Sequence, residues 1–288
     1  MSGRAAAARR RCSARPGPKS RRLPFGGPDL TRPPPSSPCA PLAVPPPRSI
    51  KFWGRVSGTT GDYLVAFGLP AEQRAPAKKW FFCTTKSLVL QQMPALSEPF
   101  EKLASSMAGQ RFLGQPGKLL GPDADAGEEE EQLDEAGNPK PKTPRFSEAH
   151  RLAYTVAAID HDTAVVPRGA FVVTPTHHVA ASPLFAGLAG ADAASLASYL
   201  HFRPAEHPSR AHALNKAGVV PATDFLDPCS EDAPRGVWSL RVDPGRGLAE
   251  LRSLKWPGYF GYHLVATPKY GAVYFGDGIE NSSLQFMV

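Results

Sequence analysis

Alternating apolar and polar positions fill the last fifth of the chain and predict four short strands there. The strands are expected over residues 237–242, 248–254, 259–266 and 270–275. Three turn-forming groups separate them: Asp243-Pro244-Gly245-Arg246-Gly247, Trp256-Pro257-Gly258 and Thr267-Pro268-Lys269. Short aromatic and β-branched runs that are interrupted by Pro and Gly are typical of an antiparallel meander.

The same period of two occurs near residue 50 and predicts a hairpin. Residues 50–56 and 63–68 alternate, with a Gly- and Ser-containing loop between them. Residues 79–85 form a third expected strand. A helix is expected over residues 97–107, because Ser97 can cap it and Pro99 is tolerated in a first turn.

Helical spacing is less regular in the middle of the chain. Residues 190–200 and 208–216 are predicted helices. Residues 151–160 and 163–171 are predicted to form a second hairpin around His161-Asp162. A helix over 148–158 is the alternative, since the alanines there fit either structure. The predicted fold class is α+β, largely antiparallel β meander and hairpins with a few short helices.

Composition divides the chain into a tail and a domain. Residues 1–49 are rich in Ala, Arg, Pro and Ser and contain one acidic residue, so a disordered basic tail is expected. A transit peptide or a gene-model artefact is the alternative interpretation. The expected domain is 50–288, and within it 116–144 carries eight acidic residues and is expected to be a flexible acidic loop.

The net charge of +7 misrepresents the expected domain. Residues 1–50 hold nine Arg, one Lys and one Asp, so the other 238 residues sum to −2. We therefore expect no nucleic-acid partner. The four cysteines are far apart, which suits a reducing compartment, and no segment is apolar enough for a membrane helix.

Few residues suggest chemistry. His177-His178 is the best metal candidate, but no companion histidine has ligand spacing. Cys83 lies among apolar neighbours that keep a thiol inert. Asp160 and Asp162 are interpreted as polar turn residues. We predict no catalytic residue, no cofactor site and no metal site.

The aromatic residues have two interpretations, as core or as partner interface. The segment Trp256-Pro257-Gly258-Tyr259-Phe260 alternates too little to be entirely internal. The candidate partner interface consists of Trp53, Trp256, Tyr259, Phe260 and Tyr270.

Six short motifs occur in an order that resembles the radial spoke head protein 9 family. They are Phe52-Trp53-Gly54-Arg55, Val165-Val166-Pro167-Arg168-Gly169-Ala170, Leu196-Ala197-Ser198-Tyr199-Leu200-His201-Phe202-Arg203, Gly236-Val237-Trp238-Ser239, Leu251-Arg252-Ser253-Leu254-Lys255-Trp256-Pro257-Gly258 and Tyr270-Gly271-Ala272-Val273-Tyr274-Phe275-Gly276. The resemblance covers about 50–288, and it departs where the family has a helical segment before the first motif.

The resemblance implies a non-enzymatic structural subunit of the radial spoke head in motile cilia and flagella. It implies a place in the cytoplasm, in the cytoskeleton of the axoneme, and roles in axoneme assembly and in relaying central-pair signals to the dynein arms. The implied partners are radial spoke head 4/6-type and 1-type proteins, radial spoke protein 3 of the stalk and central-pair projections. The alternatives are an organelle-imported enzyme with a His-based metal site, or a non-ciliary cytosolic interaction module.

Overall fold

The computed structural model describes residues 50–69, 78–123, 145–216 and 222–287. The chain divides into two units, residues 1–44 and 45–288, and every described residue belongs to the second unit. The predicted tail over 1–49, and residues 124–144 of the predicted acidic loop, lie outside the described residues.

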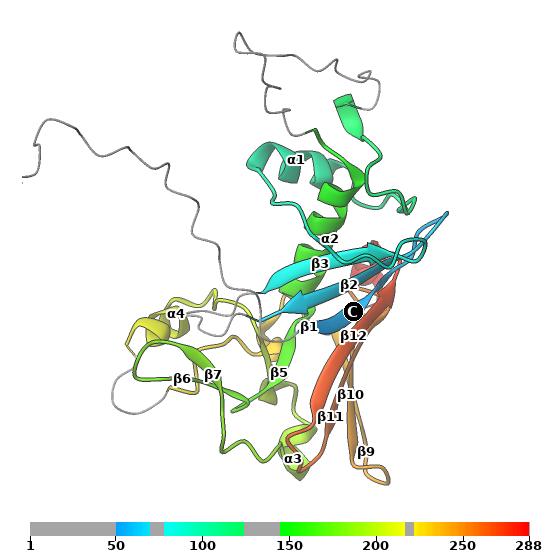
Figure 1. The fold of residues 1–288 in the computed structure, drawn as a ribbon. Helices are drawn as coiled ribbons and strands as arrows, with labels where there is room; N and C mark the ends of the chain where they lie inside the picture. The colour runs from blue at the N-terminus through cyan, green and yellow to red at the C-terminus, as the bar shows by residue number, and fades with distance from the viewer. Residues whose placement is uncertain (1–49, 70–77, 124–144, 217–221, 288) are drawn as a thin grey trace, which may run out of the picture. The chain divides into compact units, whose positions relative to one another are not determined.

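An eight-stranded sheet has the strand order β4-β3-β2-β1-β12-β11-β10-β9 (Figure 1). It consists of two runs of strands, each consecutive in sequence. The first run is β1 (Ile50–Val56), β2 (Tyr63–Gly68), β3 (Lys79–Thr84) and β4 (Gln91–Gln92). The second run is β9 (Trp238–Asp243), β10 (Leu248–Ser253), β11 (Tyr259–Leu264) and β12 (Tyr270–Gly276).

The two runs meet at a short parallel seam between β1 and β12. Only three residue pairs form it: Gly54 with Tyr274, Arg55 with Phe275, and Val56 with Gly276. All other neighbouring strands in this sheet are antiparallel. The backbone approach at the seam is close, because a Cβ at Gly54 would lie 2.2 Å from the carbonyl oxygen of Tyr274.

Helix α2 (Glu148–Thr163) packs across one face of the sheet and supplies the centre of the core. Leu152, Val156 and Ile159 are fully buried and share one face of the helix, with a spacing of four and then three residues. Ser147 caps the first turn: its side chain accepts from the backbone of His150, whose ring accepts from the backbone of Ser147. The sequence thus forms a helix here despite four β-branched residues.

A second, smaller core lies beside the large sheet, on the side that α2 covers (Figure 1). It is built from two two-stranded sheets and from Phe225 and Leu226. The first pairs β5 (Val165–Pro167) with β8 (Tyr199–His201), and the second pairs β6 (Phe171–Val173) with β7 (Val179–Ala181).

The remaining helices are short. Helix α1 (Glu98–Ser106) contacts α2 through Phe100, whose ring centroid lies 4.8 Å from that of His150. The others are α3 (Gly190–Ala193), α4 (Pro208–Asn215) and the 3₁₀ turns η1 (Gly121–Asp123), η2 (Leu196–Ser198), η3 (Cys229–Glu231) and η4 (Leu284–Phe286).

The predicted α+β class, the C-terminal meander and the N-terminal hairpin are confirmed. The predicted second hairpin over 151–171 is wrong in its first strand, which is helix α2, and the alternative helix is correct. The residues of this segment favour helix and strand about equally, so burial of the apolar face against the sheet determines that they form a helix.

The predicted helix over 190–200 is also wrong beyond its first turn. Helix α3 ends at Ala193, and Tyr199–His201 is strand β8, which pairs with β5. The backbone of these residues gains a strand partner, and the hydroxyl of Tyr199 donates to the carbonyl of Ala193 at 2.9 Å. Tertiary pairing therefore overrides a local helical pattern.

We predict that Gly54→Ala destabilises the domain by about 2 kcal/mol, because the added methyl group pushes β12 away from β1. Chemical denaturation of purified protein measures this. Gly117→Ala is the matched control, since a Cβ there meets nothing within 4 Å, and its stability should be unchanged or slightly higher. Equal stability of wild type and Gly54→Ala would contradict the tight seam.

Candidate functional site at the carboxyl end of helix α2

The last turn of α2 carries two carboxylates that reach different halves of the large sheet. Residues two apart on a helix face different directions. Asp160 accepts from the ammonium group of Lys78 at 2.6 and 2.7 Å and from the indole N–H of Trp53 at 3.3 Å. Trp53 lies in β1, and Lys78 directly precedes β3, so Asp160 contacts the first run of strands.

Asp162 makes the corresponding contacts to the second run. It accepts from the indole N–H of Trp256 at 2.7 Å and from the ammonium group of Lys255 at 2.8 Å. Both donors lie in the turn between β10 and β11. The prediction that Asp160 and Asp162 are turn residues is therefore wrong: they end a helix and anchor two tryptophans.

A third carboxylate repeats the arrangement nearby. Asp232 accepts from the indole N–H of Trp238 at 2.6 Å and contacts Nε2 of the buried His201 at 2.9 and 3.0 Å. A buried tryptophan needs a hydrogen-bond acceptor for its ring N–H, so each carboxylate fixes the orientation of one large ring. Three of the four tryptophans in the chain are held in this way.

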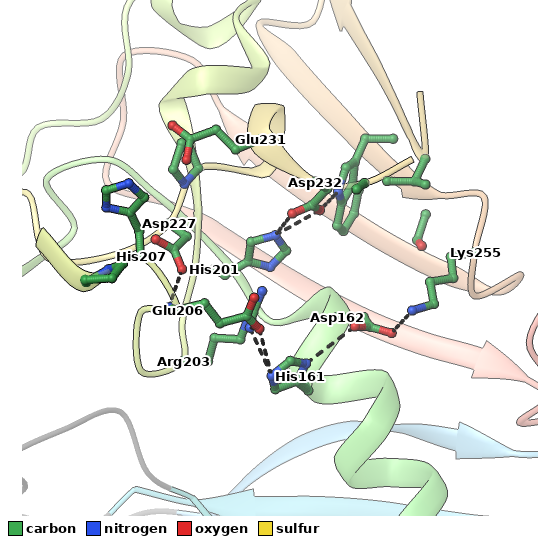
Figure 2. Close-up of a pocket in the computed structure, with 16 residues that line it drawn as sticks. His161, Asp162, His201, Arg203, Glu206, His207, Asp227, Glu231, Asp232 and Lys255 are labelled. Atoms are coloured by element: carbon green, nitrogen blue, oxygen red, sulfur yellow. Dashed lines mark hydrogen bonds and ion pairs between the residues drawn. The ribbon is translucent and has the colours of Figure 1, made fainter. Parts of the chain in front are cut away.

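An open, polar cleft with a volume of about 530 Å³ is bordered by Asp162, Lys255, Asp232, Trp238 and His201 (Figure 2). Its ionic groups are joined to one another by hydrogen bonds and ion pairs. Arg210 contacts Asp227 at 3.1 Å and Glu231 at 2.7 and 2.8 Å. Arg203 bonds Glu206 and the ring of His161.

The electrostatics of the cleft favour charged carboxylates. Burial alone would raise the pKa of Asp162, but hydrogen bonds from Lys255 and Trp256 outweigh it and hold the pKa below the ordinary value. The hydrogen bond from Arg210 lowers the pKa of Glu231. For Asp227, the backbone of Glu206 and the Arg210 guanidinium outweigh burial and likewise lower the pKa.

Several described residues around the cleft take part in structural bonds. The hydroxyl of Ser253 accepts from the backbone N–H of Trp256 at 3.2 Å. Burial raises the pKa of the Cys229 thiol well above its usual range, which disfavours a reactive thiolate. The arrangement is suited to holding aromatic rings and strands in place.

Neither a metal-binding group nor a membrane-spanning helix is found among the described residues. No group of three or more His, Cys, Asp or Glu residues there could hold a metal ion. His177 lies in the β6–β7 turn, with a ring nitrogen 3.4 Å from the carbonyl of Leu214. None of the described helices combines the length and the apolar character that a membrane crossing requires.

The residues predicted as a partner interface occupy two different environments. Trp53, Trp256 and Tyr259 are 8, 6 and 6% exposed and belong to the main core. Their burial leaves little of their surface for a partner. Phe260 and Tyr270 are half-buried, so a direct contact would be made through these two.

The structure adds exposed aromatics that sequence reasoning missed. Phe52 and Phe275 are 53 and 51% exposed, and their ring centroids are 6.2 Å apart. Tyr262 is exposed as well, and Phe260 lies two residues before it on β11. The outer-face patch, defined as Phe52, Phe260, Tyr262 and Phe275, lies on the sheet face opposite α2.

Alternation along the strands is the signal that could have found this patch. On β11 the residues Tyr259, Gly261 and His263 are buried, so Phe260 and Tyr262 must face outwards. Two arginines border the aromatic rings: Arg55 lies 5.8 Å from the Phe275 centroid, and Arg252 lies 5.8 Å from the Phe260 centroid. Without the register, the sequence did not say which alternate set is internal.

We predict that Asp162→Asn lowers the free energy of unfolding by about 2 kcal/mol at pH 7, because charge-assisted bonds to Trp256 and Lys255 weaken. The folded-state pKa of Asp162 is depressed, so its contribution is complete above the unfolded value of about 4 and disappears as pH falls through the folded value. The difference between variant and wild type should therefore shrink below about pH 4.

Denaturation curves between about pH 3 and pH 7 measure this difference. Glu98→Gln is the matched control, because Glu98 forms an exposed ion pair with Lys102 and its removal should cost less than about 0.5 kcal/mol. A penalty for Asp162→Asn that does not change with pH would contradict the role of the charge.

Comparison with known proteins finds relatives that all carry the same family name. Radial spoke head protein 9 homologs from Danio rerio, Homo sapiens and Mus musculus are 36, 35 and 35% identical over 239, 242 and 243 residues. Each match covers 83% of this chain and 84% of the relative. No model of a known protein family matches. With this identity over most of both sequences, the chain belongs to the radial spoke head protein 9 family.

Proposed function

We propose that the protein is a non-enzymatic structural subunit of the radial spoke head in the axoneme of motile cilia and flagella. Its role is to complete the head during axoneme assembly, so that central-pair signals pass towards the dynein arms. Family membership supports this proposal. The observation that carries it is the outer-face patch, an aromatic surface on a sheet whose opposite face is held by α2.

The composition of the patch suits a protein interface. Aromatic residues and arginine are enriched at the energetic centres of interfaces. Phe52 and Phe275 expose about half of their surface in this chain alone, and Arg55 lies beside Phe275. An isolated exposed Phe is ordinary, but here four aromatic residues lie on one face of three adjacent strands, and the rings of Phe52 and Phe275 are 6.2 Å apart.

The partners that we propose are the other subunits of the spoke. They are radial spoke head 4/6-type and 1-type proteins, radial spoke protein 3 of the stalk, and the central-pair projections. Phe260 and Tyr270 remain the parts of the sequence-predicted interface that a partner can reach directly. Trp53, Trp256 and Tyr259 would contribute by supporting the strands that carry the patch.

The proposal is tested on axonemes isolated from ciliated cells that lack the gene and are rescued with wild type or Phe275→Ser. The variant should be at least about 30-fold less incorporated, the effect of losing a hot spot worth about 2 kcal/mol. Quantitative proteomics measures incorporation and shows which subunits leave with it. The 4/6-type protein is expected to be depleted in parallel.

Leu184→Ser is the matched control, because Leu184 is 90% exposed and is not part of the patch. Unfolding curves of both purified variants establish that each is folded. Normal incorporation of folded Phe275→Ser would exclude the patch as the interface. Absence of the wild-type protein from axonemes of beating cilia would exclude the function itself.

A further inference from the structure

The seam between β1 and β12 opens at one end. The two strands run parallel and pair over Gly54–Val56 and Tyr274–Gly276, yet β1 begins at Ile50 and β12 at Tyr270. The first four residues of each strand therefore have no ladder across the seam. Figure 1 shows the two strands diverging towards these ends. We call this opening the notch.

The register of β11 determines which backbone groups of β12 face the notch. The N–H of Phe275 donates to Gly258, and the N–H of Leu264 donates to Lys269. These bonds lie on the β11 side and recur at every second residue of β12. The N–H and C=O groups of Tyr270 and Ala272 therefore point the other way, towards β1, where the pairing does not reach.

The exposure of Ala272 supports this geometry. Ala272 and Tyr274 are two residues apart on β12, so both side chains lie on the α2 side of the sheet. Tyr274 is 1% exposed, as expected for an interior strand, whereas Ala272 is exposed. An exposed inward-facing residue on a central strand indicates that the neighbouring strand has moved away.

A cavity of about 270 Å³ lies behind the notch. Its wall is mostly apolar and includes Phe67, Val166, Phe202 and Tyr270. Its volume is enough for one or two apolar side chains. Lys78 lies at its side, with its ammonium group bonded to Asp160 and 5.9 Å from the Phe202 ring centroid.

The described residues around the notch carry a net positive charge. Among the described lining residues, Lys51 and Lys78 are the cations and Asp160 is the only acid, and Asp160 neutralises Lys78. Lys269 is exposed and immediately precedes β12. A ligand with carboxylates beside an apolar side chain therefore complements the site.

We propose that the notch binds an extended acidic–apolar segment of a partner protein, which adds to β12 through the backbone of Ala272 and inserts one apolar side chain into the cavity. Unpaired strand edges recognise extended peptides through main-chain hydrogen bonds, and alternate side chains give specificity. This site shares Phe52 with the outer-face patch, but it does not depend on the ciliary function proposed above.

Binding is tested on the purified full-length protein with the synthetic peptide acetyl-Glu-Val-Glu-Leu-Glu-Val-Glu-amide. Isothermal titration calorimetry should give a dissociation constant of about 100 μM. The twin peptide with Lys in place of every Glu should bind at least about tenfold more weakly. N-methylation of alternate peptide nitrogens, on the edge that pairs, should abolish binding.

Two protein variants locate the site. Ala272→Pro removes the N–H group that faces the notch without removing a bond to β11, and should weaken binding at least about tenfold. Lys51→Glu should reduce the preference for the acidic peptide. Lys86→Glu is its matched control, since Lys86 is exposed near Gly61, away from the notch, and should bind like wild type. If Ala272→Pro does not fold, the N-methylated peptides still test the same bond.

Hydrogen–deuterium exchange completes the test, because bound peptide should slow exchange of the amides of residues 270–273. No acidic-peptide binding at about 1 mM would overturn the proposal, as would equal binding of the two twin peptides or insensitivity to N-methylation. Self-association of the protein that Ala272→Pro abolishes, without peptide binding, would assign the notch to a second copy and overturn it. None of these results bears on axonemal incorporation.

Discussion

Two carboxylates at the carboxyl end of α2 hold the two runs of the large sheet in one arrangement. Asp160 bonds to the first run and Asp162 to the second. The carboxyl end of a helix carries partial negative charge, so carboxylates are unfavourable there unless donors compensate. Two ammonium groups and two indole N–H groups supply that compensation. The seam itself offers only three residue pairs, so these contacts decide how the runs meet.

The proposed interface depends on this anchoring. Phe52 belongs to the first run, and Phe275 and Phe260 belong to the second, so the outer-face patch crosses the seam. On the opposite face, the buried side of α2 packs against both runs and excludes water. The hydrogen bonds of Asp160 and Asp162 and the apolar core thus act on one face of the sheet and fix the relative position of the aromatic residues on the opposite face. A surface that receives a partner benefits from such preorganisation, because less ordering is required on binding.

Much of the sheet could be predicted from sequence because its signals are local. The Pro- and Gly-containing turns fix the four strands of the C-terminal meander, and the alternation around Tyr63 fixes the N-terminal hairpin. The parallel joining of the two runs could not be predicted, because it pairs Gly54 with Tyr274 across most of the chain.

The site was less predictable, for the same physical reason. Asp162 and Trp256 are 94 residues apart, and Asp160 and Trp53 are 107 apart, so no local spacing connects them. The hairpin predicted over 151–171 places both acids in a turn, whereas they lie at the end of helix α2. The sequence singles out the aromatic residues, but the choice between Tyr259 and Phe260 as internal requires the strand register.

The shortness of the seam also has a mechanical consequence. A pulling force applied between β3 and β9 crosses every other interface on its path through longer antiparallel ladders. Between β1 and β12 the force is borne by three residue pairs and by the side chains that hydrogen-bond to α2. Under tension this section yields first, and each four-stranded half separates from the other as an intact plate.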